Sequence, residues 1–85
     1  MQERKIYISD VTSAVELVRF FSSTSYDADL DADNTRTDIK SILGVLANNV
    51  GKHSILKLYN APINEDLENF LANYRSEVTK YAVRD

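Results

Sequence analysis

Residues 26–33 read YDADLDAD, so apolar and acidic side chains alternate over the whole stretch. A period of two is typical of a β-strand with one buried face and one face in water. The wet face would carry Asp27, Asp29, Asp31 and Asp33. Alternate positions of a strand lie roughly 6.6 Å apart, and no glycine loop wraps these carboxylates around an ion. The stretch therefore predicts an open antiparallel sheet and no metal site.

The segment before this strand predicts a strand and a helix. Residues 5–9 alternate and are rich in β-branched and aromatic side chains, which favours a strand. Ser13 followed by Glu16 fits a capping box at the start of a helix. The helix would bury the stripe of Ala14, Leu17, Val18 and Phe21.

The segment after residue 33 predicts two more strands and two more helices. Residues 34–35 suit a hairpin turn into a short strand over 36–40, and Ser41 would cap a helix over 42–49. Asn49 is expected to leave that helix in the left-handed conformation, before a strand over 54–59. The last helix should run for about five turns along an apolar stripe. This stripe consists of Leu67, Phe70, Leu71, Tyr74, Val78 and Tyr81.

The resulting order, β-α-β-β-α-β-α, predicts an α+β fold: one four-stranded antiparallel sheet with three helices on one face. The 85 residues suit a single domain spanning 1–85. The chain has no cysteine, a net charge of −3 and no apolar run near the roughly 20 residues that a membrane span requires. We therefore expect a cytoplasmic protein that binds neither nucleic acid nor membrane.

The segment over 40–46, KSILGVL, carries a resemblance to a known family. It resembles the lysine-serine-isoleucine-hydrophobic-glycine-valine-hydrophobic segment that opens the second helix of HPr-like phosphocarriers of the bacterial sugar phosphotransferase system. The element order is also that of HPr, and the similarity is strongest from residue 26 to residue 74. The distance from the second strand to Ser41 is a couple of residues shorter than in typical members. The resemblance implies the open-faced β-sandwich of that family.

The chain departs from the family where HPr carries its phosphohistidine. The family motif there is glycine-hydrophobic-histidine-alanine/threonine-arginine-proline, whereas residues 8–15 read ISDVTSAV. Thr12 or Ser13 falls in the region of the histidine. A serine or threonine phosphoester is too stable to pass its phosphoryl group onward, as a phosphohistidine does. The sequence therefore predicts a protein that is not an enzyme, has no cofactor and carries no phosphate on histidine.

Ser41 is the first candidate functional residue, because the resemblance implies regulatory phosphorylation by HPr kinase/phosphorylase. The simpler alternative is a helix cap that contributes about 1 kcal/mol of stability. Ile42, Leu43 and Leu46 form the second candidate, since a short helix cannot bury all three if Val45 is buried. The resemblance implies that they dock partner proteins, with Lys40 as a polar rim; the alternative is that two of them are core.

The single histidine, His53, is expected to lie on the surface in a turn before a strand, without a helix N-terminus to hold a phosphate. Two functions remain open. The first is a regulatory or protein-binding HPr-like module of the phosphotransferase or carbon-regulation network, switched at Ser41. The second is an interaction domain that has kept the HPr fold and lost that network. Either would act as a monomer or weak dimer.

Overall fold

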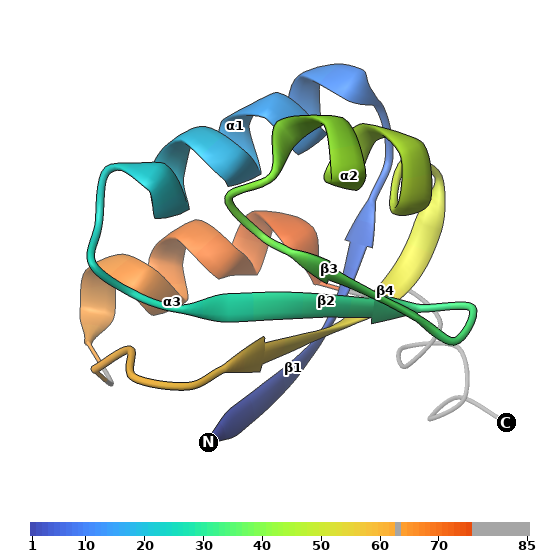
Figure 1. Ribbon diagram of the computed structural model, residues 1–85. Helices are drawn as coiled ribbons and strands as arrows, with labels where there is room; N and C mark the ends of the chain where they lie inside the picture. Colours follow the sequence, from blue (N-terminus) through green and yellow to red (C-terminus); the bar gives the residue numbers. More distant parts are fainter. Residues whose placement is uncertain (63, 76–85) are drawn as a thin grey trace, which may run out of the picture.

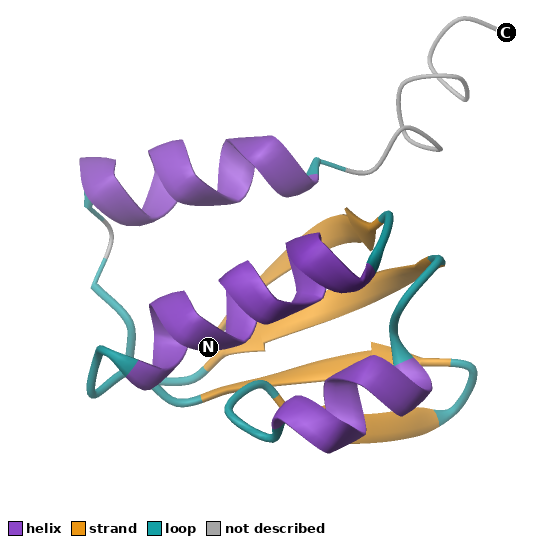
Figure 2. Cartoon of the chain, turned by 90° about the horizontal axis from the view of Figure 1, so that it is seen from above, coloured by secondary structure: helices purple, strands orange, loops and turns teal. Residues whose placement is uncertain are grey.

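The computed structural model describes residues 1–62 and 64–75 as one antiparallel sheet with the helices on one of its faces (Figure 1). Its elements are β1 (Gln2–Ile8), α1 (Val11–Ser22), β2 (Ala28–Ala32), β3 (Thr35–Asp38), α2 (Ile42–Asn48), β4 (Lys52–Leu58) and α3 (Glu65–Leu71), followed by a 3₁₀ turn (Ala72–Tyr74). The expected element order and the α+β class are confirmed. Seen from the helical side, α1 lies between α2 and α3 (Figure 2).

The strands are ordered β1-β4-β2-β3, so the third strand in sequence lies at one edge and β4 lies inside the sheet. β4 pairs antiparallel with both β1 and β2, and it aligns Leu56 with Arg4 on one side and Leu30 on the other. Alternate residues of β2 and β4 are buried, as a sheet with one covered face requires. The helices seal this face with the apolar residues Ala14, Leu17, Val18, Phe21, Val45, Leu67 and Leu71.

The face of the sheet away from the helices is held together by cross-strand charge pairs. Lys57 Nζ lies 2.8 Å from Asp31 Oδ2, and Arg36 Nε lies 3.3 Å from Asp31 Oδ1. These contacts, with Lys57 the stronger, lower the pKa of the Asp31 carboxyl. The Tyr59 hydroxyl donates to Asp29 Oδ2 at 2.9 Å. Asp29 and Asp31 therefore serve as partners for residues outside their own strand.

The start of α1 differs from the expected capping box. Asp10, not Ser13, is the N-cap: its backbone is extended, and its Oδ1 accepts the Ser13 N–H at 2.8 Å. Ser13 consequently lies within the first turn of the helix. An aspartate is as good a cap as a serine, so Asp10 can start the helix three positions earlier than Ser13.

Two turns also lie one or two positions from where the sequence placed them. The hairpin turn is formed by Asp33 and Asn34, both at positive φ, which is the geometry of the tight turns that join twisted strands. Asp33 is therefore in the turn and not on the strand face. After α2, the left-handed residue is Gly51 at φ 76°, whereas Asn49 has φ −127°. Glycine adopts this conformation without the steric cost that a side chain brings.

The last helix is shorter than its apolar stripe predicted. It becomes a 3₁₀ turn at Ala72, and Arg75 is already extended and bridges to Ile6 of β1. Tyr74 is buried, as expected, and its hydroxyl donates to the Ser13 carbonyl at 2.8 Å. Contacts with β1 and α1 thus compete with continuation of the helix. Val78 and Tyr81 lie outside the described residues.

Candidate functional site

The loop between β3 and α2 is fixed by backbone contacts. Ile39 is fully buried, and its N–H donates to the Ala28 carbonyl at 3.1 Å. Asp38 turns the chain, because its Oδ1 accepts the Lys40 N–H at 2.9 Å and its carbonyl accepts the Ser41 N–H at 3.0 Å. The loop therefore presents Ser41 from a rigid support.

Ser41 is the N-cap of α2, as the sequence predicted. Its Oγ accepts the Gly44 N–H at 3.4 Å, and the Ser41 side chain is exposed. This distance is longer than that of a typical N–H···O hydrogen bond, so the cap is a weak one.

Gly44 allows α2 to lie close to β3. A Cβ at this position would meet Thr37 Cγ2 at 2.8 Å and Ser41 Oγ at 3.0 Å. Thr37 is buried and also accepts a hydrogen bond from Asn48 Nδ2 at 3.0 Å, so it cannot easily move aside. The glycine therefore sets both the depth of α2 and the surroundings of the Ser41 cap.

The three apolar candidates on α2 occupy different environments. Val45 is fully buried, whereas Ile42 is 37% exposed and Leu43 is 78% exposed. Leu46 is partly buried and packs against the core. The helix therefore presents Ile42 and Leu43 beside the exposed Ser41, with Leu46 at the edge of the core.

Lys40 has a role that the sequence did not reveal. Its Nζ donates to the Thr24 carbonyl at 3.1 Å, and its side chain is half-buried. Thr24 follows the end of α1, so the ammonium lies where a helix C-terminus favours positive charge. Lys40 consequently connects the loop that carries Ser41 to the end of α1, and it also borders α2.

The junction between β1 and α1 consists of Ser9 and Asp10. The hydrogen bond from the Ser13 N–H, reinforced by the Ser13 and Ser9 hydroxyls, lowers the pKa of Asp10, so this junction carries a negative charge at neutral pH. Thr12 is exposed on the first turn of α1, and Ser13 is half-buried with its carbonyl bound to Tyr74. These groups comprise hydroxyls and a carboxylate.

His53 lies within β4, not in the turn before a strand. It is exposed, and its ring is 4.6 Å from the ring of Tyr7, its cross-strand partner on β1. Its neighbour Ser54 is buried, so His53 stands on the sheet face away from the helices.

Val11 is an exposed apolar residue that the sequence analysis did not single out. It is the first residue of α1 and is 58% exposed. The sequence placed the start of this helix at Ser13, and the position of Asp10 as the cap brings Val11 into the helix. Among residues 1–62 and 64–75, no three acidic, histidine or cysteine side chains cluster as metal ligands would. The helices of these ranges are too short or too polar to span a bilayer.

No protein-family model matches this chain, and no curated protein matches its sequence. Solved structures do match. The crystal structure of HPr-C-His from Thermoanaerobacter tengcongensis has a TM-score of 0.65 and 24% identity, over 86% of this chain and 89% of that one. The phosphocarrier protein HPr from Bacillus anthracis str. Ames has a TM-score of 0.66 and 20% identity, over 87% and 96%. The chain therefore has the HPr fold along most of its length.

Proposed function

We propose that this HPr-fold protein is a regulatory, protein-binding module of the sugar phosphotransferase network and not a histidine phosphocarrier. Its docking surface is the α2 patch, which we define as Lys40, Ile42, Leu43 and Leu46. The observation that carries the proposal is the exposure of Leu43, at 78%, next to the exposed hydroxyl of Ser41. An apolar side chain held in water on a rigid helix is typical of a contact site.

Phosphorylation of Ser41 would act as the switch of the α2 patch. A phosphoryl group adds close to two negative charges near pH 7. It would lie at the N-terminal end of α2, where the helix dipole favours negative charge, and next to Lys40. Asp38, whose carboxylate bonds the Lys40 N–H, would oppose it. The switch therefore changes an apolar surface into a charged one without requiring a change of fold.

The chemistry of the β1–α1 junction supports the negative part of the proposal. The residues there are Ser9 and Asp10, and the one histidine of the sequence is on the far face of the sheet. The family's carrier chemistry uses a phosphohistidine, which transfers its group far more readily than a serine or threonine ester. With no histidine at this junction, we infer a role in binding and regulation among cytoplasmic proteins of sugar uptake.

Intact-mass measurement tests the switch. After incubation with ATP and HPr kinase/phosphorylase, we expect one phosphoryl group on the protein and none on the Ser41→Ala variant. An unmodified wild-type protein would refute the switch, and a phosphate that persists in Ser41→Ala would place it elsewhere.

Docking on the α2 patch is tested separately with Leu43→Asp. Because Leu43 is on the surface, this variant should fold and be phosphorylated at least roughly five-fold more slowly, as expected for loss of a central contact. Ala72→Asp places the same charge on an exposed position after α3 and should react at the wild-type rate. Equal rates for the two variants would exclude the α2 patch as the docking surface.

Incubation with enzyme I and phosphoenolpyruvate tests the absence of carrier function. The mass should stay unchanged, and an acid-labile phosphate on the protein would overturn this part of the proposal. A protein that takes no phosphate from either enzyme would fit the second candidate, an interaction domain outside the phosphotransferase network.

A further inference from the structure

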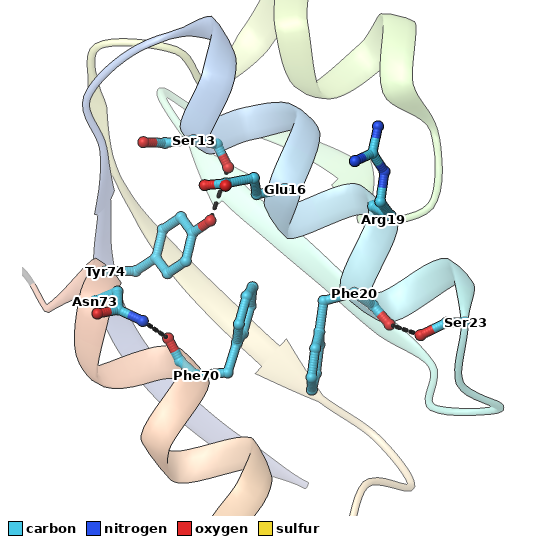
Figure 3. Close-up of a pocket in the computed structure, with 8 residues that line it drawn as sticks. All are labelled: Ser13, Glu16, Arg19, Phe20, Ser23, Phe70, Asn73 and Tyr74. Atoms are coloured by element: carbon cyan, nitrogen blue, oxygen red, sulfur yellow. Dashed lines mark hydrogen bonds between the residues drawn. The ribbon is translucent and has the colours of Figure 1, made fainter.

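Side chains of α1 and of the α3 segment line a hollow of about 500 Å³ (Figure 3). Because α1 lies between α2 and α3, the hollow is on the side of α1 away from α2 (Figure 2). This volume lies in the range of small-molecule sites, which is roughly 300–1,000 Å³. The hollow shares none of its lining residues with the α2 patch. It is therefore a separate place on the molecule, and binding there would be independent of the proposed function.

One wall of the hollow is a row of aromatic rings. Phe20 and Phe70 are stacked, with centroids 4.0 Å apart and planes 7° from parallel. Tyr74 continues the row at 5.2 Å from Phe70. Both phenylalanines are only partly buried, so part of each ring borders the hollow. Aromatic faces carry negative electrostatic potential and attract cations that have an apolar body.

The charges around the hollow also favour a cation. Glu16 is exposed and lies beside the Tyr74 ring, and among the described residues no hydrogen bond or ion pair holds its carboxylate (Figure 3). Burial raises the pKa of Tyr74 to about 12, and the negative charges of Glu16 and Asp10 add to this. The guanidinium of Arg19 points away from the rings (Figure 3). An anion would meet the carboxylate of Glu16 here, whereas an ammonium group would find a partner in it.

We infer that the hollow between α1 and α3 binds a small organic amine. The apolar or aromatic body of the amine packs on Phe20 and Phe70, and the ammonium group of the amine pairs with the carboxylate of Glu16. Ser13 and Asn73 also line the hollow.

An NMR titration of the full chain tests this inference with three probes of the same shape: phenethylammonium, 3-phenylpropionate and 2-phenylethanol, at matched ionic strength. We expect saturable shifts of the Phe20, Phe70 and Tyr74 amides with the amine, and weaker binding of the carboxylate and the alcohol. Glu16→Gln should weaken amine binding roughly three- to five-fold, the contribution of an exposed charge contact. Glu65→Gln, an exposed position at the start of α3 outside the hollow, should bind as wild type.

Three results would overturn the inference. These are an absence of saturable shifts at the lining residues, equal affinity for the three probes, and an unchanged affinity in Glu16→Gln. Because Glu16 is exposed, its variant should keep the fold, which the positions of the remaining amide signals verify.

Discussion

Tyr74 shows how much a single residue connects in this small domain. Its ring is buried next to Phe70, and its hydroxyl donates to the carbonyl of Ser13, 61 positions earlier in the chain. This bond joins the end of the α3 segment to the first turn of α1. A carbonyl that loses such a donor keeps the cost of leaving water.

We predict that Tyr74→Phe lowers the free energy of unfolding by about 1 kcal/mol, the typical net value of one hydrogen bond. Urea denaturation followed by circular dichroism measures it. Tyr59→Phe is the matched control, because it removes the same hydroxyl from an exposed bond to Asp29 and should change stability much less. Equal losses in the two variants would show that burial of the Tyr74 bond is unimportant.

At the scale of the element, α2 depends on Gly44. Alanine favours a helix over glycine by about 1 kcal/mol, so the propensity of the helix alone predicts a gain in stability on substitution. The packing predicts a loss, because the added methyl group would lie 2.8 Å from Thr37 Cγ2 and 3.0 Å from Ser41 Oγ. Overpacking in a fitted site typically costs about 1–3 kcal/mol.

Gly44→Ala should therefore destabilise the protein by about 1 kcal/mol net, since the steric cost exceeds the gain in propensity. Chemical denaturation measures the change. Ala47→Gly, at an exposed position of the same helix, gives the propensity difference without a packing change and should cost about 1 kcal/mol. A stabilised Gly44→Ala protein would mean that α2 can move away from β3 at little cost.

For the molecule as a whole, the charge contacts set the pH range of stability. The hydrogen bond from Arg4 lowers the pKa of Glu68, and contacts with Lys57 and Arg36 lower that of Asp31. A carboxyl whose pKa is lowered on folding stabilises the folded state at pH values above the pKa of about 4 that it has in the unfolded chain. This stabilisation is lost as the pH falls. Tyr74 is the reverse case, because its pKa is raised to about 12. Its contribution is complete below the unfolded pKa of about 10 and is lost as the pH rises toward 12.

We predict that the urea concentration at the midpoint of unfolding is constant near neutral pH. It should decrease as the pH drops below about 4 and decrease again as the pH rises above about 10. The advantage of the wild type over Tyr74→Phe should shrink above pH 10, because Tyr74 then ionises in the unfolded chain while the folded protein still holds it protonated. Asp31→Asn should flatten the acid limb and leave the alkaline limb intact. A pH-independent difference between wild type and Tyr74→Phe would contradict the raised pKa.

The parts of the candidate site that depend on short-range patterns were predictable. The place of Ser41 before a short apolar run identifies it as a cap, and a buried Val45 implies that other apolar residues of the same short helix are exposed. The contact of Lys40 with Thr24 was not predictable, since it joins residues 16 positions apart that meet only when α1 and α2 pack. The closeness of Gly44 to Thr37 depends on the same packing.

The amino-acid sequence alone determined the element order and the faces of the strands and helices, because side-chain periodicities of 2 and 3.6 are properties of neighbouring residues. The tertiary structure alone decided which capping residue starts α1, where α3 ends and how deeply α2 lies on β3. In each case the local sequence allows two alternatives. Either Asp10 or Ser13 can cap α1, and Arg75 can be helical or extended. The difference in free energy between them comes from contacts such as Ile6 with Arg75 and Ser13 with Tyr74, which exist only once the chain has closed on itself.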